Sequence, residues 1–183
     1  GYDVRDLSLN QVRSSMTTVM QDVFLFSDTV KENISMGERE TMEIEEVTQA
    51  ARLAQAHDFI VEMENEYSTV IGERGVGMSG GQKQRISIAR TFAKPAPILV
   101  MDDSTSALDM ETESEIQKAL KEVSGKTKVI IAHRISAVRH ADEILILEAG
   151  KIAERGTHEE LIAQKGLYYE TYMAQYGAFM EVS

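Results

Sequence analysis

The chain has 183 residues, of which 43% are hydrophobic and 27% are charged, a balance that suits one globular domain or part of one. Its net charge of −11 argues against broad binding to a nucleic-acid backbone, which needs clustered lysine and arginine. The absence of cysteine excludes disulfides, thiol chemistry and cysteine-ligated metals, and it fits a cytosolic setting. No apolar run approaches the roughly 18 residues of a membrane span.

The first expected elements are a strand over residues 16–20, which is β-prone and leads to Gln21, and a helix over residues 43–57. The apolar residues on one face of that helix are Val47, Ala50, Ala51 and Ala54. A glycine-rich stretch then precedes a second helix over residues 82–93. This helix must end at Lys94-Pro95, because proline cannot continue it.

The apolar run over residues 98–101 predicts a parallel strand that is buried on both faces. It ends in two adjacent carboxylates, Asp102 and Asp103, which is the arrangement expected of a magnesium and water site. Asp109 is placed to cap the next helix. The apolar face of this helix is formed by Ile116, Ala119, Leu120 and Val123.

A second buried strand is expected over residues 128–132. Residues 144–147 and 151–154 flank Ala149-Gly150 and predict a hairpin, and the sequence from Thr157 fits a capping box that opens a helix. Strands that alternate with helices predict an α/β fold with a parallel sheet.

The helical part of the chain is concentrated in one stretch. Residues 22–94 are expected to form a mostly helical subdomain, set into a core made by residues 1–21 and 95–183. The 183 residues are therefore interpreted as one domain with an inserted lobe.

Gly125-Lys126-Thr127 imitates a phosphate-binding loop. The motif requires G-x-x-x-x-G-K-[ST] between a strand and a helix, but Leu120 stands where the first glycine is needed. The order is also reversed, since a helix precedes the triplet and a strand follows it. Gly125 is interpreted as a left-handed cap that ends the helix, so the chain contains no phosphate loop.

Ser79-Gly80-Gly81-Gln82 carries the strongest local signal. Alone, serine followed three residues later by glutamine predicts a capping box. The two glycines add a second interpretation, because a helix start without side chains lets backbone N–H groups approach an anion. The longer string SGGQKQRISIAR over residues 79–90 is far more specific than a cap.

This string resembles the signature sequence of ATP-binding cassette (ABC) ATPases, with Met78 where leucine is usual. Other motifs of the family stand in the expected order. They are Gln21 as the Q-loop glutamine, residues 71–75 (IGERG) as a stretch typical of exporter-type cassettes, residues 98–103 as Walker B, residues 106–109 as the D-loop, His133 as the switch histidine, and residues 156–161 as the tail of an exporter cassette.

The resemblance implies a P-loop NTPase sheet with an inserted helical subdomain, in which two cassettes sandwich two ATP molecules head to tail. Ser79, Gly80, Gly81 and Gln82 would then meet the γ-phosphate held by the partner cassette. The other implied roles are Asp102 and Gln21 for Mg²⁺, His133 for the γ-phosphate and the attacking water, Asp103 for positioning that water, and Asp109 for contact with the partner cassette.

Asp103 departs from the family pattern, because active cassettes usually carry glutamate there. Its carboxylate retreats by about one carbon–carbon bond, and a misplacement of about 1 Å can cost roughly 10²-fold in rate. We therefore expect a degenerate site that binds ATP but hydrolyses it slowly, within a heterodimer whose partner has the faster site. The alternative is that aspartate serves as a slow base.

The family's adenine-stacking residue, first strands and Walker A would precede the segment that resembles residues 1–9. We therefore expect a C-terminal part of a larger exporter subunit, which by itself binds ATP weakly and is inactive. Apolar edges beside Val100 and Ile130 should be exposed and favour self-association.

The predicted function is that of the nucleotide-binding domain of an ABC exporter at the cytoplasmic face of a membrane, with a transmembrane domain and a second cassette as partners. Two alternatives stay open. One is a soluble ABC ATPase of DNA repair or translation, and the other is a non-catalytic regulatory cassette.

Overall fold

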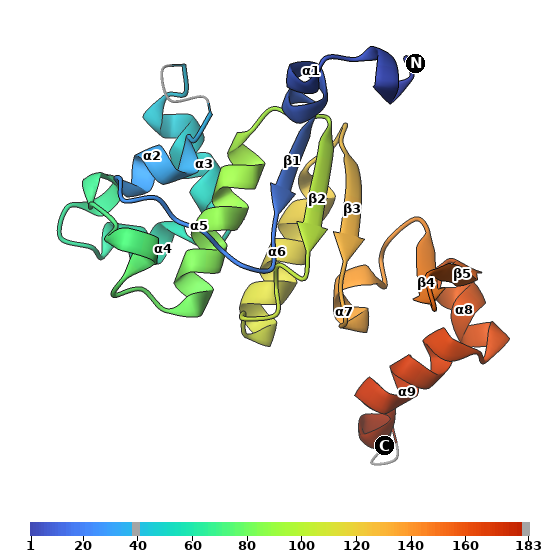
Figure 1. Cartoon of the computed structure of the whole chain (residues 1–183). Helices are drawn as coiled ribbons and strands as arrows, with labels where there is room; N and C mark the ends of the chain where they lie inside the picture. The colour runs from blue at the N-terminus through green and yellow to red at the C-terminus, as the bar shows by residue number, and fades with distance from the viewer. Residues whose placement is uncertain (38–40, 181–183) are drawn as a thin grey trace. The chain divides into compact units, whose positions relative to one another are not determined.

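The computed structural model describes residues 1–37 and 41–180, which divide into two compact units (Figure 1). The first unit comprises residues 1–131 and the second begins at Ala132. Within the described residues, no helix is long and apolar enough to cross a membrane.

The first unit is built on a parallel sheet with the strand order β1-β2-β3. The strands are β1 (Met16–Val19), β2 (Ile98–Asp102) and β3 (Thr127–Ile131). Val19 lies opposite Met101, and Asp102 lies opposite Ile131. The sheet confirms the predicted α/β class, and all three strand positions agree with the sequence prediction to within one residue.

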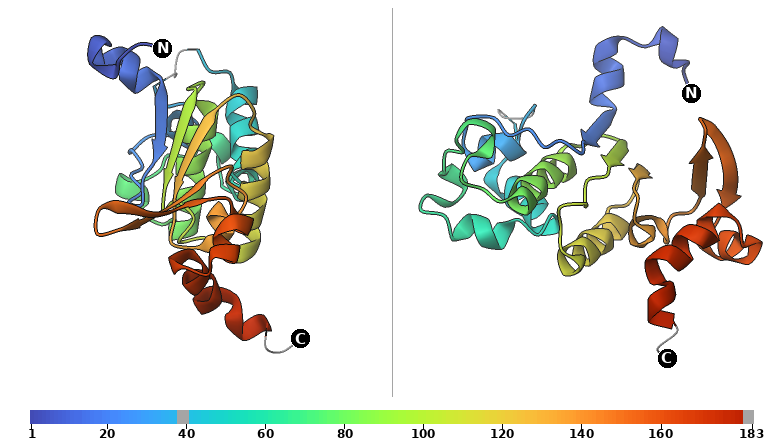
Figure 2. Two further views of the ribbon diagram at one scale, coloured as in Figure 1. Left: turned by 90° about the vertical axis from the view of Figure 1, so that its right-hand side faces the viewer. Right: turned by 60° about the horizontal axis from the view of Figure 1, so that its bottom comes forward.

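One face of this sheet is covered by α5 (Gly80–Ala93) and α6 (Met110–Glu122), which lie on the same side of it (Figure 2). The core on that face contains Val19, Leu99, Met101, Ile86, Ile116 and Leu120. On the other face, Val129 and Ile131 are 45% and 52% exposed.

The prediction of fully buried strands is therefore wrong for β3, and β2 is only half-buried on its outer face. A parallel strand is enclosed only when helices cover both faces, and the described helices of this unit cover one. The predicted exposed apolar surface beside Val100 is present, because Val129 pairs with Val100. It lies on a face of the sheet as well as at its edge.

The segment between β1 and β2 is mostly helical, as expected for residues 22–94. It contains α2 (Val30–Ile34), α3 (Ile44–Leu53), α4 (His57–Val61), the 3-10 turns η2 (Glu66–Ser68) and η3 (Glu73–Gly75), and α5. Ahead of the sheet lie the turn η1 (Val4–Asp6) and α1 (Leu9–Ser14).

The single helix expected over residues 43–57 is wrong, because α3 ends at Leu53 and α4 starts at His57. Gln55 has a left-handed φ of 55°, and the Ala56 N–H donates to the Ala51 carbonyl at 2.7 Å. These are the features of a Schellman ending, which usually uses glycine at the left-handed position. No glycine marks it here, so this stretch of sequence contains no typical signal for a helix end.

Two other helix ends differ from the prediction. The helix α5 begins at Gly80, two residues earlier than expected, because Ser79 is its N-cap. The helix α6 is capped by Asp109 as predicted, but it ends at Glu122 with an extended Val123. Gly125, with a φ of 74°, therefore forms the turn before β3 and does not cap the helix.

The second unit contains α7 (Ile135–Val138), the antiparallel hairpin of β4 (Ile144–Glu148) and β5 (Lys151–Gly156), α8 (His158–Gln164) and α9 (Leu167–Met180). The predicted turn at Ala149-Gly150 is confirmed by the φ values of 49° and 76°. The capping box at Thr157 is also confirmed. The core of the unit is formed by Ile135, Ile144, Leu161 and Tyr168.

Candidate functional site

The two predicted magnesium ligands lie at the same edge of the sheet. Asp102 is the last residue of β2, and Gln21 follows the end of β1 by two residues. Because β1 and β2 are parallel with Val19 opposite Met101, their carboxyl ends point to the same side (Figure 1). Ligands of open α/β sheets bind outside the carboxyl ends of the strands.

The oxygens at this edge fit a magnesium ion. Mg²⁺ is usually bound through one or two carboxylates, and it takes its remaining oxygens from water and substrate phosphates. Within the described parts of the chain, no group of three or more His, Asp or Glu residues is placed to hold a metal ion alone. The Asp102 carboxylate and the Gln21 amide oxygen are ligands of the kind that Mg²⁺ accepts.

Asp103 is held by its backbone in a left-handed conformation, with a φ of 42°. Its N–H donates to the Ile131 carbonyl on β3 at 2.8 Å, and its own carbonyl accepts a hydrogen bond from the Ser106 hydroxyl at 3.0 Å. Aspartate tolerates this region better than most residues do. The Asp103 side chain is therefore carried by a turn that is fixed to the sheet, which the sequence did not indicate.

The start of α5 has the capping box that was predicted for residues 79–82. The Ser79 hydroxyl accepts from the Gln82 N–H at 3.2 Å, and the Gln82 side-chain oxygen accepts from the Ser79 N–H at 2.9 Å, so the capping box is real. Gly80 is exposed, and a Cβ there would lie 4.0 Å from its nearest heavy atom, the Ala107 Cβ. An anion can therefore approach the amides of the first turn.

The segment of residues 106–109 lies against the start of α5. The Ala107 N–H donates to the Gln84 side-chain oxygen at 3.3 Å, and a Cβ at Gly81 would lie 3.4 Å from the Ala107 carbonyl. Gln84 is 2% exposed. Sequence reasoning missed Gln84, although a buried polar residue on an amphipathic helix needs a hydrogen-bond partner.

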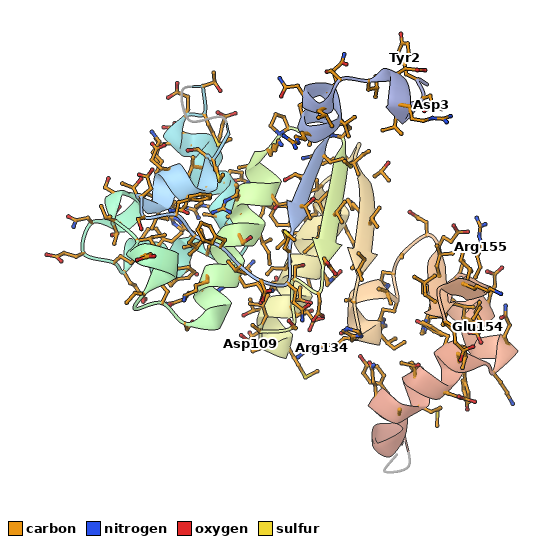
Figure 3. The ribbon with its side chains drawn as sticks, in the orientation of Figure 1. Tyr2, Asp3, Asp109, Arg134, Glu154 and Arg155 are labelled. Atoms are coloured by element: carbon orange, nitrogen blue, oxygen red, sulfur yellow. The ribbon has the colours of Figure 1, made fainter. Side chains whose placement is uncertain are left out.

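Asp109 is the N-cap residue of α6 (Figure 3). It accepts hydrogen bonds from the Thr112 N–H and the Thr112 hydroxyl, both at 2.8 Å. These bonds hold the pKa of Asp109 below its usual value, so the carboxylate is charged at neutral pH. Asp109 therefore has a structural role as a helix cap, alongside the partner contact that the resemblance implies.

Arg90 of α5 is a second residue that sequence reasoning did not single out. Its guanidinium donates to the Asn33 carbonyl at 2.7 Å, to the Asn33 side-chain oxygen at 3.1 Å and to the Phe24 carbonyl at 3.2 Å. It also lies over the Phe26 ring, 5.8 Å from its centroid. Burial lowers the pKa of Arg90 to about 10, so it remains a cation at neutral pH. The signature helix is thus tied to the segment that follows Gln21.

His133 belongs to the second unit, where its side chain is exposed. Its carbonyl accepts a hydrogen bond from the Gln175 amide nitrogen of α9 at 2.8 Å. The Gln175 amide oxygen accepts from the Ile135 N–H at 3.0 Å. The backbone that carries His133 is therefore held from α9, a contact that the sequence did not suggest.

Comparison with known proteins agrees with the family that the sequence resembles. The family model described as "ABC transporter" matches residues 1–106, which include Gln21, the signature and both strand-end carboxylates. The chain belongs to the ABC transporter family. The described sheet and helices are accordingly those of an ABC ATPase fold.

The relatives of this ABC chain are transporter proteins. It is 52% identical over 174 residues to the uncharacterised ABC transporter ATP-binding protein YknU of Bacillus subtilis. The matched residues cover 94% of the chain and 30% of that relative. It is also 52% identical over 176 residues to a putative multidrug export ATP-binding/permease protein of Staphylococcus aureus, covering 96% of the chain and 30% of the relative.

A solved structure extends this likeness to three dimensions. A bacterial Atm1-family ABC exporter with ATP bound has a TM-score of 0.90 and 42% sequence identity, covering 94% of the chain and 30% of the exporter chain. The ABC chain thus spans about 30% of the length of the relatives that it matches.

Proposed function

We propose that this chain is the nucleotide-binding part of an ABC exporter, which couples ATP binding and hydrolysis to transport across a membrane. The observation that carries the proposal is the placement of Asp102 and Gln21 at one edge of a parallel sheet. The Staphylococcus relative supports the export direction, because it is described as an export ATP-binding/permease protein.

The residues of this chain would act by binding and orienting. Asp102, through water, and Gln21 would hold a Mg²⁺ ion, which when bound neutralises charge on the phosphates. Asp103 would position the attacking water, and His133 would contact the γ-phosphate and the same water. Catalysis of phosphoryl transfer rests mostly on such positioning and on electrostatic stabilisation.

A second cassette would complete the site from the other side. The open start of α5, with Ser79, Gly80, Gly81 and Gln82, supports a role in meeting the γ-phosphate held by that partner. Asp109 would lie at the same junction. We favour a heterodimer, because Asp103 weakens this chain's own site while its signature is nearly intact.

The remaining partner would be the transmembrane domain of the same transporter, which places this chain at the cytoplasmic face of a membrane. A regulatory cassette without catalysis of its own is the second candidate, and the shortened Asp103 side chain is the feature that favours it. A soluble ABC ATPase of DNA repair or translation is disfavoured by the transporter names of the relatives.

The chain by itself is expected to bind ATP weakly and to be inactive. Its sequence contains no G-x-x-x-x-G-K-[ST] string, whose backbone amides and lysine provide most phosphate contacts. A nucleotide titration of the 183-residue chain measures this directly. An ATP dissociation constant of about 1 μM, equivalent to about −8 kcal/mol, would contradict the expectation.

The proposed role of the signature is tested by Gly80→Asp in the full-length transporter. A Cβ at Gly80 would make only an ordinary contact, 4.0 Å from the Ala107 Cβ, and a carboxylate in the first turn suits the helix dipole, so α5 should keep its stability. The same carboxylate would repel the γ-phosphate. We expect ATPase turnover to fall about 10²-fold, the effect of losing one contact that stabilises the transition state.

Gly80→Asn is the matched control, because asparagine has the same shape as aspartate without its charge. It should lower turnover much less, and both variants should unfold at the wild-type temperature. Wild-type turnover of Gly80→Asp would show that no phosphate meets the start of α5. The proposed role of residues 79–82 would then be wrong.

A further inference from the structure

The side-chain amide of Gln175 closes over the backbone at residues 133–135. Its nitrogen donates to the His133 carbonyl at 2.8 Å, and its oxygen accepts from the Ile135 N–H at 3.0 Å. The two bonds use opposite ends of one planar group, so they fix both the distance and the orientation of α9 relative to this stretch of backbone.

The Ile135 N–H needs this outside partner. Ile135 is the first residue of α7, and the preceding Arg134 makes no side-chain cap hydrogen bond. The first N–H groups of a helix have no acceptor within the helix itself. Gln175 therefore satisfies one of these unpaired donors, and through the second bond it also holds the His133 peptide.

The helix that carries Gln175 is itself anchored in the second unit. Near its start, the fully buried Tyr168 shares a hydrogen bond with the His158 ring nitrogen at 2.7 Å, and the Tyr168 N–H donates to Glu154 at 3.0 Å. Gln175 lies seven residues further along α9, on the same face as Tyr168. The amide is thus presented from a fixed helix.

We propose that Gln175 is a positioning residue that fixes the backbone from which the His133 imidazole reaches a γ-phosphate. The inference rests on the proposed role of His133. A displacement of about 1 Å in such a group can lower the reaction rate roughly 10²-fold. Losing the two hydrogen bonds that fix its peptide should therefore have a large effect. Gln175→Met keeps the length of the side chain and removes both bonds.

The test is the preference of the full-length transporter for ATP over ADP at this chain's own site. Only ATP carries the γ-phosphate that His133 would contact, and binding can be measured even where hydrolysis is slow. The probes are a photoreactive non-hydrolysable ATP analogue and photoreactive ADP, with labelling of this chain as the readout. We expect Gln175→Met to weaken ATP-analogue binding about tenfold, the loss of about 1.4 kcal/mol, and to leave ADP binding unchanged.

Three variants make the outcomes distinguishable. His133→Ala should weaken ATP-analogue binding at least as much, and the double variant should show no further loss, because Gln175 acts through His133. Gln164 is an exposed glutamine of α8, and Gln164→Met should change the binding of neither nucleotide.

If His133→Ala kept the wild-type preference for the ATP analogue over ADP, the proposed role of His133 would be wrong, and so would the inference. Loss in His133→Ala but wild-type preference in Gln175→Met would overturn only the inference. A further loss in the double variant, or equal weakening of ADP, would show that Gln175 acts on the fold and does not act through His133.

Discussion

Arg90→Lys and Arg90→Met are both expected to destabilise the first unit, and the lysine variant should be no milder than the methionine variant. The Arg90 guanidinium satisfies three oxygen acceptors with one rigid fork. A lysine ammonium is a point charge that cannot reach all three, yet it keeps the cost of burying a cation. Methionine removes that cost but takes the donor from the Asn33 carbonyl, while the Asn33 side-chain oxygen keeps its bond from the Phe26 N–H.

The expected loss is about 1–3 kcal/mol for either variant, the cost of leaving one buried acceptor without a donor. Denaturant unfolding of the full-length protein, followed by hydrogen exchange over α2 and α5, gives the measurement. Arg52→Met is the control, because Arg52 is an exposed arginine of the neighbouring helix α3. Wild-type stability in Arg90→Lys would contradict the argument from fork geometry.

The same variants should lower ATP turnover beyond their effect on folded yield. Arg90 links the helix that starts at Gly80 to the Phe24 carbonyl, three residues after Gln21. If this link were only structural, turnover per folded molecule would equal that of the wild type.

Asp103→Glu is expected to raise ATP turnover at the site formed on β2 by up to about 10²-fold. The extra methylene moves the carboxylate outward by about one bond length, which is the scale of displacement that changes rates by this factor. The backbone at Asp103 is fixed to β3 by its N–H bond to Ile131, so the longer side chain starts from the same place.

The structure adds a cost to this change. Asp103 has a φ of 42°, a region that glutamate occupies less readily than aspartate, so the variant should lose about 1 kcal/mol or less. Asp103→Asn is the control, because it keeps the size and removes the carboxylate. Turnover that is the same in Asp103→Glu and the wild type would rule out side-chain length as the handicap.

The sequence determined those features whose partners lie within a few residues of each other. The caps at Ser79, Asp109 and Thr157 and the turn at Ala149-Gly150 were predicted correctly, because each depends on hydrogen bonds or φ values inside one short segment. The family also followed from the sequence, since its motifs are strings of neighbouring residues in a fixed order.

Local signals failed where the deciding interaction was not marked by a typical residue. The helix expected over residues 43–57 breaks at a left-handed Gln55, a position that glycine usually holds. The burial of β3 failed for another reason, since an apolar strand does not reveal whether one or two layers of helices will cover it.

Only the tertiary structure decided which residues hold the predicted site in place. Gln84 pairs with Ala107 across 23 residues, Arg90 with Asn33 across 57, and Gln175 with His133 across 42. Each bond serves a polar group that must find a partner, but the sequence does not say which one. Folding brings the two groups of each pair within about 3 Å of each other. Which groups meet is decided by how whole helices pack against the sheet and the hairpin.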